Sequence, residues 1–546
     1  MLKKLFRLYH TVNPLRYEQI WYRLYYKLLP LRKLPDFSGQ YTANTWIWNG
    51  PEFIKPSYLG NSTYCFLNCE GVIQTPDDWN NPKFEKLWLY NLHYFDDLNA
   101  QDNLQRKDQL LEQVMRWTRD NPPVSGNGWE PYPLSLRIVN LVKWYRRASI
   151  ADQTIVNSIA QQSEALSRQL EYHILGNHLF ANAKALIFSG CFLNGPKACL
   201  YLDLGIKILD KELPEQFLED GGHFELSPMY HCILLWDLLE LIHLASISGN
   251  NKLVERIQRW SGIAKKGLFW LKNMVHPDGD ISFFNDSAFG IAPSPSEIFS
   301  FAHKVGIEPV LNEKFRLITL PVSGYSKVVM PKHSLIFDHA AIGSDYLPGH
   351  GHADALSFEW SVGSQRVFVN SGTSVYGIGK ERLRQRQTAA HNTVEVNHTD
   401  SSEVWSGFRV ARRANAKLEV SEEFDDSVIL VASHDGYKRL SKSIVHRREV
   451  WVKEQVISIK DDLIGSEIPA TAHFHVHPDI KATQINDQNV ELVLPNGTNL
   501  AFYTSGLCQI QKTTWHPYFG ESIHSNKIIV QLNGPELMTS ITIPKV

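Results

Sequence analysis

The sequence predicts an α+β protein of several domains, in which an N-terminal array of helices precedes a C-terminal sandwich of antiparallel β-sheets. Two observations lead to this prediction. Apolar residues recur at helical spacing over much of the chain before about residue 275, and at a spacing of two beyond about residue 325. A chain of 546 residues is also too long for one ordinary core, so roughly two or three domains are expected.

The helical half is predicted from a series of amphipathic segments joined by links rich in Gly, Pro and Asn. These segments cover residues 109–119, 134–147, 155–170, 178–192, 200–213, 230–248 and 252–275. Periodicity alone leaves a bundle, a solenoid and an α/α toroid open. We assign residues 84–322 to this helical domain and residues 1–83 to an extension that packs on or beside it.

The second half, residues 323–546, consists of short β-rich runs between turns, such as SFEWSVGSQRVFVN and RREVWVKEQVISIKDDL. Many strands at this spacing favour two packed antiparallel sheets. The stretch DGDISFFNDSAFGIAPSPSEI, residues 278–298, is expected to cross between the two halves.

Charge and motifs exclude several functions. The 55 basic and 57 acidic residues give a net charge near −2, so no general attraction to nucleic acid is expected. The sequence has no P-loop, dinucleotide Gly motif, HExxH or GxSxG. Its six cysteines match no common metal knuckle, and we interpret most of them as free thiols of a reducing compartment.

The N-terminal segment, residues 2–32, interleaves Lys and Arg with Leu, Phe, Trp and Tyr and contains one acid, Glu18. No apolar signal region or membrane-spanning run is recognised, which favours a cytoplasmic protein. The segment has two interpretations. It suits peripheral contact with an anionic inner membrane, or a helix that packs its aromatic face on the rest of the protein. The second is favoured.

The cluster richest in chemistry is Gly349-His350-Gly351-His352-Ala353-Asp354. In an extended segment His350 and His352 point to one face, which suits a metal site or paired acid and base. A third histidine, His391, lies in a similar setting. His473, His475 and His477 lack an acid or cysteine at ligand spacing, so we interpret them as residues of a sheet.

Two helix starts carry further candidates. Asn177 and His178 open a predicted helix, where Asn alone would be interpreted as an N-cap. Tyr230 and His231 follow Ser-Pro, an ordinary helix entry, and so occupy a first turn.

These motifs together resemble the heparinase II/III-like family. GNHLFANAKAL, DGGHFELSPMYH, PGHGHADALSFEW with FVNSGTSVYG, and TAAHNTVEVN occur in the order of the family and span both halves. The opening, with LWLYNLHYFDD and YPLSLRIVN, is similar to a subgroup among bacterial surface-polysaccharide biosynthesis proteins. The resemblance implies an incomplete α/α toroid followed by an antiparallel β-sandwich, with the active site in the cleft between them.

The resemblance also implies roles for individual residues. Asn177 and His178 would bind and neutralise a uronate carboxylate. Tyr230 would act as base or acid at the reacting carbon, with His350 as its counterpart across the cleft. Further substrate contacts are expected from Arg137, Tyr376, Arg384, Arg386, His231 and Asp286, because guanidinium groups match carboxylate geometry.

A structural zinc site of the family would fall on His352, Asn370 and His391. The middle position is usually an acid, whereas this chain has Asn, which is a poor zinc ligand. The departure weakens the expectation of a metal, and no cofactor is required by the chemistry.

The expected function is a polysaccharide lyase that cleaves an acidic polysaccharide by β-elimination, linked to surface-polysaccharide biosynthesis or turnover. Its partner would be an acidic polysaccharide or a lipid-linked oligosaccharide. Two alternatives remain open: a uronate C5 epimerase, which shares removal of the C5 proton, and a non-catalytic glycan-binding assembly protein. The oligomeric state is not predicted.

Overall fold

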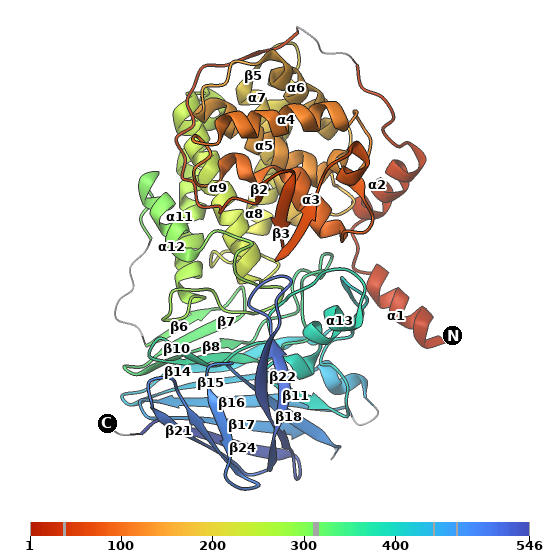
Figure 1. The fold of residues 1–546 in the computed structure, drawn as a ribbon. Helices are drawn as coiled ribbons and strands as arrows, with labels where there is room; N and C mark the ends of the chain where they lie inside the picture. Colours follow the sequence, from red (N-terminus) through yellow and green to blue (C-terminus); the bar gives the residue numbers. More distant parts are fainter. Residues whose placement is uncertain (1, 36–39, 310–315, 441–442, 466–467, 545–546) are drawn as a thin grey trace.

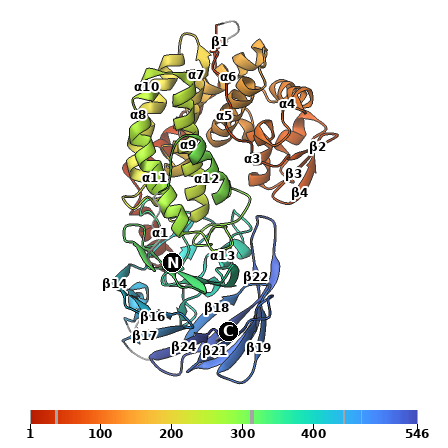
Figure 2. The ribbon, with the colours of Figure 1, turned by 90° about the vertical axis from the view of Figure 1, so that its left-hand side faces the viewer.

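The protein is described here by a computed structural model, which covers residues 2–35, 40–309, 316–440, 443–465 and 468–544. A helical half stacks on a β-sandwich, as both Figure 1 and Figure 2 show. The predicted order of helices and then antiparallel sheets is therefore confirmed.

The helices of the first half begin and end close to the predicted segments. They are α3 (Lys86–Tyr94), α4 (Lys107–Asp120), α5 (Pro131–Arg147), α6 (Gln153–Ser167), α7 (Gly176–Phe192), α8 (Ala198–Gln216), α9 (Pro228–Ser248), α10 (Asn251–Val254), α11 (Ile257–Asn273) and α12 (Pro295–Lys304). The single helix predicted over residues 252–275 is wrong, because a turn at residues 255–256 divides it into α10 and α11.

Helix α9 lies in the core of this half, against α7, α11 and α12. Within the described ranges it is the one helix with the length and apolar composition of a membrane span, and 78% of that window is buried inside the protein. The burial explains its composition, because a helix that is apolar all round belongs in a core.

The sandwich consists of two antiparallel sheets. The first has the order β22 (Leu507–Trp515), β23 (Ile523–Gln531), β18 (Ala470–Val476), β10 (Gln365–Phe368), β9 (Phe358–Val362), β8 (His333–Asp338), β7 (Tyr325–Val329) and β6 (Leu317–Leu320), with β11 (Val394–Val396) beside β18. The second has the order β14 (Ala416–Glu423), β15 (Ser427–His434), β16 (Val445–Lys453), β17 (Val456–Ile464), β24 (Glu536–Thr542), β21 (Asn499–Thr504), β20 (Asn489–Val493) and β19 (Lys481–Gln484).

Aromatic rings fill the space between the two sheets. Phe368 of β10 contacts Trp360 and Phe474 from the same sheet, and Phe502 from the facing sheet. His473 and His475 lie in β18, as predicted, and both are buried. The alternation of buried residues along β16 and β17 is the period of two that the sequence displayed.

Small elements complete the chain. The extension contains α1 (Leu2–Val12), α2 (Tyr17–Leu28), and a small sheet of β2 (Tyr58–Gly60), β3 (Thr63–Phe66) and β4 (Cys69–Val72); the other short elements are β1 (Thr42–Ala43), β5 (Leu193–Asn194), β12 (Val404–Trp405), β13 (Arg409–Val410) and α13 (Lys380–Arg386). The favoured expectation that the aromatic face of residues 2–32 packs on the protein holds only in part. The rings of Tyr22 and Tyr26 pack near Tyr172 and His173, whereas Phe6, Tyr9, Trp21 and Leu24 are exposed.

The segment 278–298 does connect the halves, and it does so by its backbone. The amide of Phe283 donates to the Glu359 carboxylate, and that of Asn285 to Asp354. The chain then returns to the helical half as α12, which contacts α9 and α11, before β6 begins. The crossing is therefore a loop laid on the sandwich, and it carries Asp286 to the junction.

Candidate active site

The motifs of the sequence meet where the helical half faces the sandwich, and three of the segments there are introduced by an unusual backbone conformation. Leu175, Leu226 and Asn285 all have positive φ, of 73°, 60° and 56°. Non-glycine residues seldom adopt this region, and such residues concentrate at functional sites. Each stands just before a candidate motif, so the strained residues set the directions in which the motifs enter the junction.

Tyr230 and His350 lie side by side at this junction. Their ring centroids are 4.0 Å apart, with the planes tilted by 33°. The Tyr230 hydroxyl is 3.0 Å from that of Tyr376. Tyr230 is placed by the start of α9, where the Ser227 side chain accepts the Tyr230 backbone N–H and Pro228 occupies the first turn. The predicted convergence of Tyr230 and His350 is confirmed.

Asp286 fixes the orientation of His350. The His350 Nδ1 lies 2.8 Å from the Asp286 carboxylate, which leaves Nε2 as the nitrogen available for a proton transfer. Burial lowers the pKa of His350, although Asp286 opposes that effect. The imidazole is therefore neutral at neutral pH, with its Nδ1–H donated to Asp286.

Asp286 was expected to contact substrate, and the structure contradicts this. The residue is fully buried, and its carboxylate also accepts from His352 Nε2, at 2.8 Å, and from the guanidinium of Arg382. Burial acts to raise the pKa of Asp286, but Arg382 and the two histidines hold it well below its ordinary value. Asp286 is an ionised anchor for its neighbours.

Asn177 and His178 lie in the first turn of α7. The N-cap of this helix is Leu175, so the interpretation of Asn177 as an N-cap is wrong. His178 Nδ1 is 2.9 Å from the Glu171 carboxylate, which holds the ring. The His178 ring lies 4.4 Å from that of Tyr132, and the side chain of Asn177 is hydrogen-bonded to Tyr132. Tyr132 thus joins this pair.

Three residues expected to bind substrate are structural. Arg137, His231 and Arg386 are fully buried. Arg137 donates to the backbone carbonyls of His93 and Gly128, and His231 Nε2 bonds the carbonyl of Gly267. Arg386 donates to backbone carbonyls, including that of Gly351. The expectation that these three residues bind substrate is therefore corrected. The sequence could not show that their side chains are buried.

Arg384 and Tyr376 remain candidates for substrate contact. The Arg384 side chain is 37% exposed and pairs with Glu381 at 2.6 Å, and it also bonds His516. Tyr376 lies beside the catalytic candidates through its hydroxyl contact with Tyr230. Their roles as substrate contacts stay predictions.

Glu225 is a site residue that the sequence reasoning did not assign. It is 1% exposed, its carboxylate lies 3.7 Å from His350 Nε2, and neither oxygen has a hydrogen-bond partner within normal geometry. Burial, with a contribution from Asp286, raises the pKa of Glu225 to about 8. Its place in the motif HFELSP could have indicated Glu225 as a site residue, but the sequence does not show that its carboxyl is buried.

The predicted metal triad consists of neighbours joined by hydrogen bonds. His352 Nδ1 is 3.3 Å from His391 Nε2, and His391 Nδ1 is 3.1 Å from the Asn370 oxygen. Since His352 Nε2 bonds Asp286, both nitrogens of both rings are already engaged. The described part of the chain holds no group of three His, Cys, Asp or Glu at metal spacing. This donor set does not fit a zinc ion.

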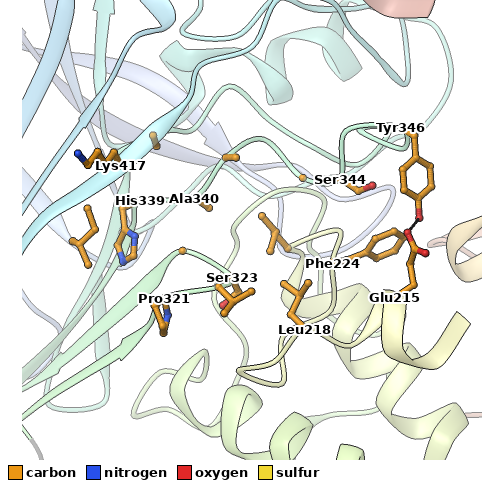
Figure 3. Close-up of a pocket in the computed structure, with 17 residues that line it drawn as sticks. Glu215, Leu218, Phe224, Pro321, Ser323, His339, Ala340, Ser344, Tyr346 and Lys417 are labelled. Atoms are coloured by element: carbon orange, nitrogen blue, oxygen red, sulfur yellow. Dashed lines mark hydrogen bonds between the residues drawn. The ribbon is translucent and has the colours of Figure 1, made fainter. Parts of the chain in front are cut away.

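A separate cavity of about 600 Å³ also opens at the junction of the two halves. Figure 3 shows Glu215 and Tyr346 at one end of it, and His339 and Lys417 at the other. The Tyr346 hydroxyl donates to Glu215 at 2.9 Å. None of the candidate catalytic residues lines this cavity, so it has no part in their chemistry.

Comparisons with known proteins agree with this architecture. The family model described as Heparinase II/III N-terminus matches residues 81–294, and that described as Heparinase II/III-like, C-terminal, matches residues 313–543. A solved structure of heparinase III shares the fold, with a TM-score of 0.68 at 17% identity, covering 88% of this chain and 79% of that one. The toroid and sandwich implied by the resemblance are thereby confirmed.

Two curated relatives were also found. A heparin-sulfate lyase of Bacteroides stercoris is 24% identical over 63% of this chain and 53% of its own length. FtsZ-localized protein C of Caulobacter vibrioides is 25% identical over 78% of this chain and 75% of its own. The chain thus spans about half the length of the first of these relatives. Because the two family models together match most of the chain, the protein belongs to the heparinase II/III-like family.

Proposed function

We propose that the protein is a polysaccharide lyase that cleaves an acidic, uronate-containing polysaccharide by β-elimination. The observation that carries the proposal is the pairing of a phenol and a neutral imidazole at one site, with His350 oriented by Asp286 and in contact with Tyr230. Such a pair supplies the acid and the base that elimination needs. Relatives named heparin-sulfate lyase support the same class of reaction.

The protonation states of Tyr230 and His350 suit Tyr230 as the acid and His350 as the base. Burial, with Tyr376, raises the pKa of Tyr230 well above its ordinary value, so the phenol keeps its proton. His350 is neutral and Nε2 can accept one. His350 takes the C5 proton, the C5–H electron pair forms the C4–C5 double bond, and the C4–O4 bond breaks. Tyr230 gives its proton to O4, so one proton is taken and one is supplied.

Removal of the C5 proton requires that the uronate carboxylate be neutralised first. Asn177 supplies an amide donor for this step, and His178, whose Nδ1–H is donated to Glu171, becomes a second donor when its Nε2 also carries a proton. Donors fixed before substrate arrives stabilise the developing enolate without reorganisation. Their position at the start of α7 adds the favourable end of a helix dipole for an anion.

The test is incubation of the purified protein with a panel of acidic polysaccharides, read by ultraviolet absorbance and by NMR. Cleavage gives an unsaturated uronate that absorbs. Tyr230→Phe and His350→Ala should abolish the signal, whereas Tyr503→Phe, an exposed tyrosine of β21, should retain it. Exchange of the C5 hydrogen with solvent deuterium without absorbance would instead identify a C5 epimerase.

A non-catalytic role is the other outcome of that panel. The relative of Caulobacter vibrioides is named for its localisation with FtsZ, and it matches this chain over more of its own length than the lyase does. Saturable glycan binding with neither cleavage nor exchange, by a protein that is folded, would replace the lyase proposal by a binding one.

We also propose that the substrate is a polysaccharide or lipid-linked oligosaccharide handled inside the cell during surface-polysaccharide biosynthesis or turnover. The six cysteines are free thiols, as is usual in a reducing compartment. Fractionation of the native source tests the location. Recovery from the periplasm or the medium would contradict it.

A further inference from the structure

The first two helices expose many large apolar side chains to solvent. Their exposed fractions range from 41% to 76%. The residues are Leu5, Phe6, Leu8, Tyr9, Val12, Tyr17, Ile20, Trp21, Leu24, Tyr25 and Leu28. Figure 1 shows α1 projecting from the body near the junction of the two halves. Apolar surface gathered in this way is rare on a monomer and marks an interaction site. We call it the N-terminal face.

Polar groups, together with the rings of Tyr22 and Tyr26, which lie 4.7 Å and 5.5 Å from the rings of Tyr172 and His173, hold α2 to the body. Arg16 forms an ion pair with Glu215 of α8, and Gln19 donates to the backbone carbonyl of Tyr346 at 3.2 Å. The Tyr26 hydroxyl donates to the carbonyl of Leu170 at 2.6 Å. A helix on a protein ordinarily buries its apolar side and exposes its polar side. Here Tyr17, Ile20, Trp21, Leu24 and Leu28 stay exposed, so this apolar side of α2 is available to a partner.

The charges around the N-terminal face indicate the partner. The exposed side chains of Lys4, Arg7, Lys27, Arg32 and Lys33 accompany the apolar ones. The single acid in residues 2–35 is Glu18, which lies 3.5 Å from Lys211. Basic residues beside aromatic ones suit the headgroup region of an anionic bilayer. We propose that the N-terminal face docks the protein on an anionic membrane surface.

A short hairpin connects the N-terminal face with the active site. Trp405 of β12 donates its indole N–H to the Thr11 hydroxyl of α1 at 3.1 Å. Phe408, at the turn of the same hairpin, has its ring 5.2 Å from that of Tyr376 and 6.0 Å from that of His350. Membrane docking therefore brings the site beside the bilayer. The inference that the substrate is carried on a lipid rests on the proposed function. The membrane docking does not depend on that function.

The test is co-sedimentation of the full chain with vesicles of phosphatidylethanolamine and phosphatidylglycerol, against vesicles of phosphatidylcholine alone. We expect binding to the anionic vesicles at low salt, weakened as salt screens the charges. The variant Ile20→Ser, Trp21→Ser, Leu24→Ser removes outward apolar groups and none of the polar anchors. It should lower the partition coefficient by about tenfold or more. Ile485→Ser with Leu507→Ser, which removes exposed apolar groups of the sandwich, is the matched control and should bind as the native protein does.

Three results would overturn the proposal. They are no binding of the native protein to anionic vesicles at low salt, equal binding by the triple variant, or a stable dimer in solution that the triple variant converts to a monomer. Thermal unfolding of each variant verifies that it is folded. Because no polysaccharide is present, failure of the lyase proposal leaves this measurement unaffected. A third variant, Lys4→Glu with Arg7→Glu and Lys27→Glu, should lose binding chiefly at low salt.

Discussion

The Tyr230 ring, at the start of a helix of the first half, lies 4.0 Å from the ring of His350, which is carried by a loop of the second half. Neither residue can act without the other element in place. Chemistry at this contact therefore depends on the docking of the helical half on the sandwich, and not on either half alone.

Replacement of Tyr230 by Phe keeps the ring and removes the hydroxyl. We expect the rate of cleavage to fall by roughly 10²–10⁴, the usual contribution of a positioned acid or base. The free energy of unfolding should change little, because the hydroxyl has Tyr376 as its one described hydrogen-bond partner and a single neutral hydrogen bond contributes only about 1 kcal/mol. Initial rates and urea unfolding measure the two effects. A variant that retains native turnover would contradict the role of Tyr230.

Replacement of Asp286 by Asn should damage both activity and stability. The carboxylate accepts from His350, His352 and Arg382, and Asn offers one acceptor oxygen and no charge. Arg382 would be left buried without its counter-charge, which typically costs about 3–5 kcal/mol. Urea unfolding gives that loss. For the activity, kcat should fall further than KM rises, because the change disturbs the orientation of a base. An unchanged kcat/KM would show that Asp286 does not position His350.

The sequence could predict the meeting of the motifs, because a resemblance in several separate stretches implies one shared site. It could not predict which polar residues are enclosed. Arg137 and Arg386 looked like anchors for carboxylates, but both are buried and donate to backbone carbonyls instead. It also could not predict that a row of apolar side chains on α2 stays exposed, since periodicity gives the faces of a helix and not which of them meets the body. The sequence also could not identify Glu225 as a site residue, because the pKa of Glu225 is raised by burial, which the sequence does not show.

Metal analysis should find no stoichiometric zinc in the purified protein after dialysis, and chelator should leave the melting temperature unchanged. Both imidazoles of the predicted triad are used in hydrogen bonds, and Asn370 is a neutral ligand. Asn370→Asp places a carboxylate beside His391 and should raise the zinc content. Zinc in the native protein that resists dialysis would show that Asn370 does not prevent binding.

The final prediction concerns Glu225, whose pKa is raised by burial to about 8 from an ordinary value of 4.5. Between these values the folded protein holds a proton that the unfolded chain has lost. The contribution of this group to stability is therefore complete below about pH 4.5 and is lost as pH rises to about 8, by up to about 1.4 kcal/mol per pH unit. Glu225→Gln has no such proton. The unfolding free energy of the variant should fall less steeply over that window.

The same titration should appear in substrate binding. Above about pH 8 the ionised Glu225 adds a negative charge beside His350 and close to Asn177, where the substrate carboxylate is proposed to bind. Repulsion between the two anions should raise KM in the native protein, whereas KM of Glu225→Gln should stay level and kcat should change little. Steady-state kinetics from pH 6 to 10, about two units on each side of the raised pKa, make the comparison. Parallel KM profiles for the two proteins would mean that Glu225 does not ionise in this range or does not sense the substrate.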